Sequence, residues 1–293
     1  MSEPTPGQFP SPQPPEPAAG TSRARRGLSF LLGPEKFAQL RAMGDYFALH
    51  DFLVGADGSL DLARRKGSAY LLVGPGTAAA QVVRNCLDWI ERNNFFCTLT
   101  WHTPSELVLD SLVYWKQRIT TADLCPAAQS YLFPGEMDLD VESVLSKDAV
   151  RYALEIERSF DYTLLSAYGF NLQTGRTCYY YEREVALQRA LASLPSRRKY
   201  LFLDPDKFDR PGQGGYGLAE LLGSCQMLSI YTVQSDRSAA LIARFAELAA
   251  RTLDLLKPGE NASAPDVRTL RLVLAGDGEA PTVPIYAGRL RSS

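Results

Sequence analysis

Residues 70–90, YLLVGPGTAAAQVVRNCLDWI, are the most informative stretch of this sequence for its fold class. The apolar run 70–73 has the length of a buried strand, and the pattern from Thr77 onward is that of a helix. Gly74 and Gly76 stand between the two elements. A turn between a parallel strand and a helix lies at the carboxyl edge of the sheet, where open α/β sheets bind ligands. The stretch therefore predicts an α/β unit and leaves two interpretations of the turn, ordinary turn chemistry or a cradle for an anion.

Strands and helices alternate along the rest of the chain. Expected strands cover residues 69–73, 96–100, 162–166, 199–203 and 227–232. Expected helices cover residues 77–92, 104–115, 146–158, 181–192 and 238–256. This alternation predicts a three-layer α/β sandwich around a mostly parallel, Rossmann-like sheet.

Composition divides the chain into four segments. Residues 1–26 are rich in Pro, Gly, Ser and Glu, which predicts a disordered tail. Residues 27–65 carry a helical pattern, and residues 66–237 form the expected α/β domain. Residues 238–293 add a helix and an extension that predicts two short strands. The apolar side of that helix indicates that it covers the sheet or joins a homo-oligomer.

Net charge, the lengths of apolar runs and the spacing of cysteines and histidines limit the classes of function to be considered. The chain has 293 residues and a formal net charge of −2, so no general attraction to nucleic acid is expected. No apolar run approaches the roughly 18 residues needed to span a bilayer, and the N-terminus lacks an apolar signal-peptide core. We expect a cytoplasmic protein that does not associate with membranes. The five cysteines and two histidines are not spaced as zinc ligands, so we expect reduced thiols, no metal and no cofactor.

The Gly-Pro-Gly-Thr turn has the properties of an anion site. A helix N-terminus offers unpaired N–H groups and the positive end of the helix dipole. Gly76 lets a ligand approach the backbone, and Thr77 can cap the helix or donate to a phosphate. The turn is neither a Walker A sequence nor a complete G-x-G-x-x-G. An ordinary turn with an N-cap remains an equal alternative.

Polar residues follow two further expected strands. Trp101 and His102 can stack on a ligand or hydrogen-bond to it, or they are a packed aromatic and a solvent-facing histidine. Lys207 can reach an anion at the same edge, while Asp204 and Asp206 bind sugar hydroxyls or hold the lysine. The alternative is a polar Asp-Pro-Asp turn with its lysine in solvent.

The order of these motifs resembles the C-terminal sensor domain of DeoR-type sugar-responsive transcription repressors, over residues 66–236. That domain belongs to the superfamily of ribose-5-phosphate isomerase, glucosamine-6-phosphate deaminase and the CoA transferases, which implies a fold of this type. Residues 74–78 match the family's phosphate-binding turn; Gly76 and Thr77 are kept, but Ala78 replaces a threonine. Other matched positions are Thr100 and Trp101 at a Thr-Asn pair, Gly169 in a glycine-rich strand end, Glu182 or Glu184 at an acidic helix start, and Lys207 at the ligand lysine.

The resemblance implies a phosphorylated sugar or similar small anionic metabolite as ligand. The implied ligand-binding residues are Gly74, Gly76, Thr77, Ala78, Thr100, Trp101, His102, Gly169, Glu182, Asp204, Asp206 and Lys207. Residues 28–65 contain one long amphipathic pattern in place of the family's helix-turn-helix, so direct nucleic-acid binding is not expected.

Three functions remain open. The first is a non-catalytic phosphosugar sensor that signals through a homo-oligomer or a partner, favoured by the retained Gly76, Thr77 and Lys207. The second is a sugar-phosphate isomerase or deaminase, which needs a placed carboxylate base. The third is a ligand-free interaction scaffold. It is favoured because residues 74–78 lack hydroxyl groups that the family's phosphate-binding turn carries.

Overall fold

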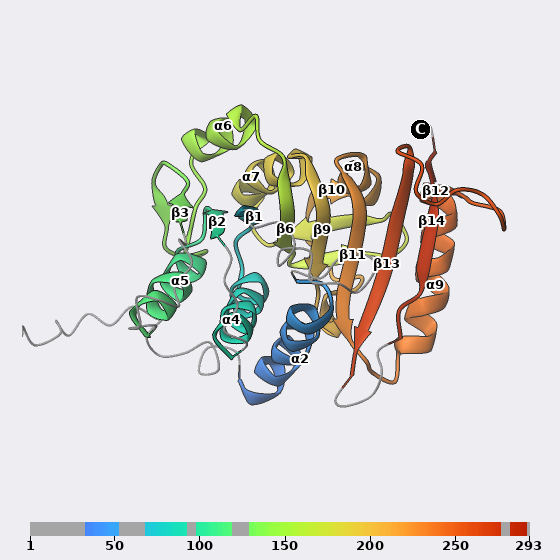
Figure 1. The fold of residues 1–293 in the computed structure, drawn as a ribbon, viewed down its shortest axis with the longest axis horizontal. Helices are drawn as coiled ribbons and strands as arrows, with labels where there is room; N and C mark the ends of the chain where they lie inside the picture. The colour runs from blue at the N-terminus through green and yellow to red at the C-terminus, as the bar shows by residue number, and fades with distance from the viewer. Residues whose placement is uncertain (1–32, 53–67, 93–97, 119–128, 277–281, 292–293) are drawn as a thin grey trace, which may run out of the picture.

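The computed structural model describes residues 33–52, 68–92, 98–118, 129–276 and 282–291. One nine-stranded sheet dominates it, in the order β12-β14-β13-β11-β9-β6-β1-β2-β3 (Figure 1). Its strands are β1 (Ser68–Val73), β2 (Thr98–Thr103), β3 (Gln129–Leu132), β6 (Phe160–Ser166), β9 (Ser196–Phe202), β11 (Cys225–Val233), β12 (Leu253–Leu255), β13 (Val267–Ala275) and β14 (Ile285–Leu290). The seven strands from β13 to β3 pair in parallel, and only β14 and β12 pair antiparallel.

Helices cover both faces of the sheet. One face is covered by α2 (Pro34–His50), α4 (Thr77–Arg92) and α5 (Glu106–Arg118) (Figure 1). The other is covered by α6 (Lys147–Glu155), α7 (Glu182–Ser193), α8 (Leu218–Gly223) and α9 (Ser238–Thr252). Successive residues of β1 serve the two faces in turn, since Leu71 and Val73 lie in the first core and Leu72 in the second. The predicted α/β sandwich around a mostly parallel sheet is confirmed.

Two small sheets and a short helix follow the carboxyl ends of the central strands. The first small sheet has the order β10-β8-β7 and consists of β7 (Gly169–Asn171), β8 (Arg176–Tyr179) and β10 (Gln213–Gly217). The second is the hairpin of β4 (Met137–Asp138) and β5 (Ser143–Val144). The short helix is the 3₁₀ helix η2 (Pro205–Lys207). Strand β7 follows β6, and η2 follows β9. These additions therefore build walls at the edge where the sequence predicted a site.

Helix 77–92 is confirmed as predicted, but the next two elements lie further along the chain. The strand expected at 96–100 runs to Thr103, because pairing with β3 continues as far as Thr103 and Leu132. The helix expected at 104–115 consequently begins at Glu106 and ends at Arg118. Residues 96 and 97 of the expected strand lie outside the described residues, as do the predicted N-terminal tail and parts of segment 27–65.

The C-terminal segment completes the same sheet. Strand β13 pairs with β11 over seven positions, so the sheet continues beyond residue 237. The two predicted terminal strands are confirmed as β13 and β14. Helix α9 ends at Thr252, four residues earlier than expected, because residues 253–255 pair with β14 as β12.

Within the described part of the chain, no helix combines the length and the apolar character that crossing a membrane requires. Cys86, Cys178 and Cys225 are free and buried, as predicted for the thiols. Cys97 and Cys125 lie outside the described ranges.

Candidate functional site

A cavity of about 340 Å³ opens at the carboxyl edge of the sheet, and we call it the carboxyl-edge cavity. Its walls come from the ends of β1 and β6, from the β4–β5 hairpin, from η2, and from helices α2 and α7. The lining residues are Lys36, Pro75, Gly76, Thr77, Asp140, Val141, Ser166, Ala167, Tyr168, Tyr179, Tyr180, Tyr181, Glu184, Gln188, Lys207 and Arg210. Three of the predicted ligand residues, Gly76, Thr77 and Lys207, are therefore brought together.

The Gly-Pro-Gly-Thr turn is held tightly against the end of β6. Gly74 donates its N–H to the Leu164 carbonyl at 2.8 Å, and the Ser166 hydroxyl donates to the Pro75 carbonyl at 2.8 Å. Gly76 has φ 116°, and a Cβ at this position would lie 2.3 Å from Ser166 Oγ. Only glycine fits such a backbone at such a distance.

The turn ends in a helix start that lacks a side-chain cap. The first backbone bond of this helix runs from the Ala80 N–H to the Gly76 carbonyl at 3.1 Å. No acceptor among the described residues contacts the N–H groups of Thr77 or Ala78. The Ala78 side chain itself is buried in the core beneath α4. The unpaired N–H groups and the helix dipole make this terminus attractive to an anion.

Two lysines from distant segments share one buried carboxylate beside the cavity. Lys207 Nζ lies 3.7 Å from Asp204 Oδ2, and Lys36 Nζ lies 3.3 Å from the same atom. Only 1% of the Asp204 side chain is exposed, so this aspartate holds the lysines and does not line the cavity. Burial lowers the pKa of Lys207, and Asp204 opposes that shift. Two cations against one carboxylate leave a local positive charge.

Tyrosines form a second wall of the carboxyl-edge cavity. Tyr168 packs against Tyr180 with ring centroids 5.4 Å apart, and Tyr180 packs edge-on against Tyr181 at 4.7 Å. The Arg210 guanidinium lies 4.1 Å from the centre of the Tyr168 ring. These tyrosines were not predicted as site residues. The run Tyr-Tyr-Tyr at 179–181 is the available signal, but the resemblance matches this stretch only to an acidic helix start.

Of the two acidic positions matched by the resemblance, Glu182 or Glu184, helix α7 brings Glu184 to the cavity, together with Gln188. Glu184 accepts the Tyr181 N–H at 3.1 Å at the start of the helix, and burial raises the pKa of this carboxyl. Gln188 is 1% exposed and lines the cavity, yet its Oε1 has no hydrogen-bond partner in the described chain. Residues 184 and 188 are four apart and share one helix face, whereas Glu182 is exposed on another.

The structure does not bring Thr100, Trp101 and His102 to the cavity. The β1–β2 register sets Thr100 opposite Tyr70 and His102 opposite Leu72, so all three lie within the strand before its end. Trp101 is fully buried in the core beneath α4.

His102 does not line the cavity, and it is not solvent-facing. It is 6% exposed and stacks on Tyr131 with ring centroids 4.8 Å apart. Phe160 meets the same imidazole edge-on at 5.4 Å. Desolvation lowers the pKa of His102 to about 4, and the charge of Arg158 adds to this.

Two further predicted residues have other roles. Gly169 does not line the cavity, and a Cβ there would lie 2.7 Å from Cys178 Sγ and 2.8 Å from the Arg210 carbonyl oxygen. This glycine is therefore required by the close packing of β7 on β8. Asp206 is exposed and belongs to a separate groove between α2 and the end of β11, which also contains Glu35 and Asp236.

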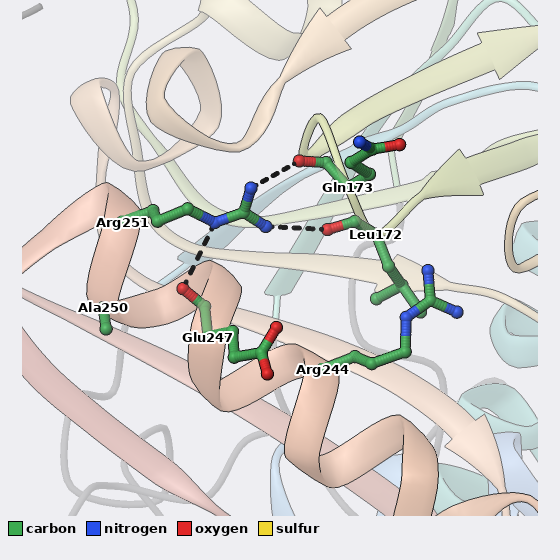
Figure 2. Close-up of a pocket in the computed structure, with 6 residues that line it drawn as sticks. All are labelled: Leu172, Gln173, Arg244, Glu247, Ala250 and Arg251. Atoms are coloured by element: carbon green, nitrogen blue, oxygen red, sulfur yellow. Dashed lines mark hydrogen bonds between the residues drawn. The ribbon is translucent and has the colours of Figure 1, made fainter.

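A second basic region lies along helix α9, and we call it the α9 groove (Figure 2). It is formed by Leu172, Gln173, Arg244, Glu247, Ala250 and Arg251. Arg251 donates to the Gln173 carbonyl at 2.8 Å and to the Leu172 carbonyl at 3.2 Å, as Figure 2 shows. Arg244 pairs with Asp209 at 2.5 Å. Both guanidinium groups thus fix neighbouring segments of the chain.

No protein-family model matches the sequence, and no curated protein matches it. Among solved structures, ribose 5-phosphate isomerase from Plasmodium falciparum is 11% identical with a TM-score of 0.34, over 58% of this chain and 52% of that one, about half its length. Ribose 5-phosphate isomerase A from Methanocaldococcus jannaschii is 11% identical with a TM-score of 0.33, over 87% and 81% of the two chains. A monomeric glucosamine-6-phosphate deaminase is 12% identical with a TM-score of 0.31, over 72% and 84%. At these identities and TM-scores, the similarity assigns neither a ligand nor a residue role to this chain.

Proposed function

We propose that this protein is a non-catalytic sensor of a small phosphorylated metabolite, of the phosphosugar kind, which it binds in the carboxyl-edge cavity. One observation supports this above all others. The unpaired N–H groups at the start of α4 and the ammonium groups of Lys36 and Lys207 border a single cavity. A phosphate placed there receives hydrogen bonds from the backbone and charge from two lysines.

The carboxylates around the cavity favour binding over turnover. Asp204 is paired with two lysines, and Asp140 is paired with Arg183 at 3.0 Å. Glu184 accepts the Tyr181 N–H as part of a helix cap. Each carboxylate therefore has a structural partner, whereas a general base must be able to reach a substrate proton.

One observation favours the alternative of an isomerase or deaminase. Glu184 lines the cavity, and its pKa is raised by burial, which is a property of catalytic carboxylates. The enzyme reading therefore requires Glu184 as its base. Any phosphosugar that binds should be assayed for turnover with wild type and with Glu184→Gln.

The relation to DeoR-type sensor domains, the cytoplasmic location and signalling through a homo-oligomer remain parts of the proposal. Helix α9 packs Phe245, Leu248 and Ala249 into the protein's own core. The apolar side of this helix thus covers the sheet, and an oligomer would use another surface. Light scattering of the purified protein with and without ligand measures the oligomeric state.

The test is thermal stabilisation of the full chain by inorganic phosphate and a panel of sugar phosphates. A ligand at about 100 times its Kd adds about 2.7 kcal/mol to stability, which raises Tm by several degrees for a chain of this size. Lys36→Gln should weaken the effect, and Lys147→Gln, an exposed lysine outside the cavity lining, is the matched control. No concentration-dependent shift with any phosphorylated compound would contradict the proposal.

A further inference from the structure

We infer that the ligand of the carboxyl-edge cavity carries a flat aromatic base as well as its phosphate, and is a nucleoside monophosphate. This inference rests on the proposed function, because the phosphate is placed at the α4 N-terminus and Lys207. It adds a second recognition element, the tyrosine wall formed by Tyr168, Tyr180 and Tyr181.

The tyrosine wall presents an open aromatic face. Tyr180 is 61% exposed although it lines a cavity, whereas Tyr179 beside it is only 2% exposed. Tyr168 is already covered by the Arg210 guanidinium, and Tyr181 by that of Arg183 at 4.4 Å. The Tyr180 ring is therefore the member of the wall that can accept a stacked partner. Aromatic side chains bind nucleobases in this way, through stacking of the two ring systems.

Three polar groups that could bind the hydroxyls of a sugar ring already have partners within the protein. A sugar ring needs a hydrogen-bond partner for most of its hydroxyls when it is buried. Asp140 and Glu184 are engaged by Arg183 and by the Tyr181 N–H, and the Ser166 hydroxyl donates to Pro75. These three groups are thus partly or fully committed within the protein. A flat base needs fewer polar partners per unit of buried surface.

Gln188 supplies one polar contact of the required kind. Its side chain is buried, its Oε1 has no partner among the residues described, and it lines the same cavity. The same Oε1 lies next to the Gly-Pro-Gly-Thr turn. A Cβ built on Gly74 would be 3.8 Å from it. An amide can accept from and donate to the hydroxyls or ring edges of a nucleoside. The cavity volume of about 340 Å³ lies within the range of about 300–1,000 Å³ that is typical of ligand sites.

The experiment compares binding of the full chain to AMP, GMP, CMP, UMP, ribose 5-phosphate, glucose 6-phosphate and inorganic phosphate by calorimetry. The variants are Tyr180→Ala and Tyr180→Phe, the second of which keeps the ring. Tyr114→Ala is the matched control, because Tyr114 is 62% exposed on α5 and is not part of the cavity lining.

We expect at least one nucleoside monophosphate to bind tenfold or more tightly than ribose 5-phosphate. Tyr180→Ala should weaken that binding about 5- to 150-fold, the loss typical of one stacked base, and should leave ribose 5-phosphate and phosphate unchanged. Tyr180→Phe and Tyr114→Ala should bind as wild type does.

Two results overturn the inference, and they differ in what they leave standing. If a sugar phosphate binds as tightly as every nucleotide and Tyr180→Ala changes nothing, the aromatic ligand is wrong but the phosphosugar sensor stands. If no phosphorylated compound binds to the folded wild type, the proposed function fails and the inference fails with it.

Discussion

The carboxyl-edge cavity and the α9 groove both contain basic side chains, but they differ in what surrounds them. In the α9 groove, Arg251 donates to three carbonyl groups and Arg244 pairs with Asp209. In the carboxyl-edge cavity, Lys36 and Lys207 share the single carboxylate of Asp204. The start of α4 adds N–H groups for which the described chain offers no acceptor. Basic side chains alone therefore do not make an anion site. Such a site needs N–H and ammonium donors that outnumber the acceptors that the protein offers them.

The largest effect is expected at the turn that shapes the cavity. Gly76→Ala should destabilise the protein by about 3 kcal/mol, because φ 116° strains any other residue and the new Cβ would clash with Ser166 Oγ. Urea unfolding measures the change in free energy. Gly214→Ala is the control, since nothing lies within 4 Å of a Cβ there, and it should change stability little. Equal destabilisation by both would contradict the account of the turn.

Charge replacement distinguishes the two basic regions directly. Lys207→Gln should lower the affinity for phosphate or phosphorylated ligand about 10- to 100-fold, because a charge-assisted hydrogen bond is lost. Arg251→Gln should leave that affinity unchanged and lower stability by about 1 kcal/mol, through loss of its bonds to Leu172 and Gln173. Calorimetry and urea unfolding measure the two quantities. Weaker anion binding in Arg251→Gln would mean that the regions had been assigned the wrong way round.

His102 should affect pH-dependent stability and leave binding unchanged. Its pKa falls from 6.5 to about 4 on folding, so the unfolded chain binds the extra proton between these values. Stability should therefore fall as pH decreases from 6.5 to 4. His102→Phe should remove about 1–2 kcal/mol of that fall, measured by urea unfolding at several pH values. A loss of phosphate affinity in this variant would instead support the ligand role that the sequence predicted.

The smallest effect is expected on helix α7, where Glu184 lines the cavity and Glu182 is exposed to solvent. Glu184→Gln should cost about 1 kcal/mol or less, because the capping contact to Tyr181 is weakened but kept in part. Glu182→Gln should change stability by less than about 0.5 kcal/mol, since its side chain is exposed. Ligand affinity should respond only to the first substitution. A loss of ligand affinity in Glu182→Gln alone would select Glu182, the other position matched by the resemblance.

Local patterns predicted the parts of the site that lie close together in the sequence. Helix 77–92 was predicted with its observed ends, because its start signal and its apolar periodicity are contained within the helix. Gly76 and Thr77 follow from the same stretch. Trp101 and His102 were misplaced because the end of β2 depends on pairing with β3, in a region with no clear strand pattern.

Residues far apart in the chain completed the site in ways that no local pattern indicates. Lys36 reaches Asp204 across 168 positions of sequence, and nothing near Lys36 marks it as a site residue. Tyr180 and Gln188 resemble ordinary surface and core residues until the fold sets them beside the turn.

The local sequence is enough to predict the alternation of strands and helices, the glycine turn after the first strand, and the lysine that follows the strand YLFL. These features depend on periodicity and backbone preference over a few residues, which the local sequence contains. Which side chains share the cavity, and which carboxylates are already paired, follows from the three-dimensional packing of the chain. The burial and charge of a side chain depend on neighbours that folding brings together from distant parts of the chain. The function of this edge of the sheet depends on the same neighbours.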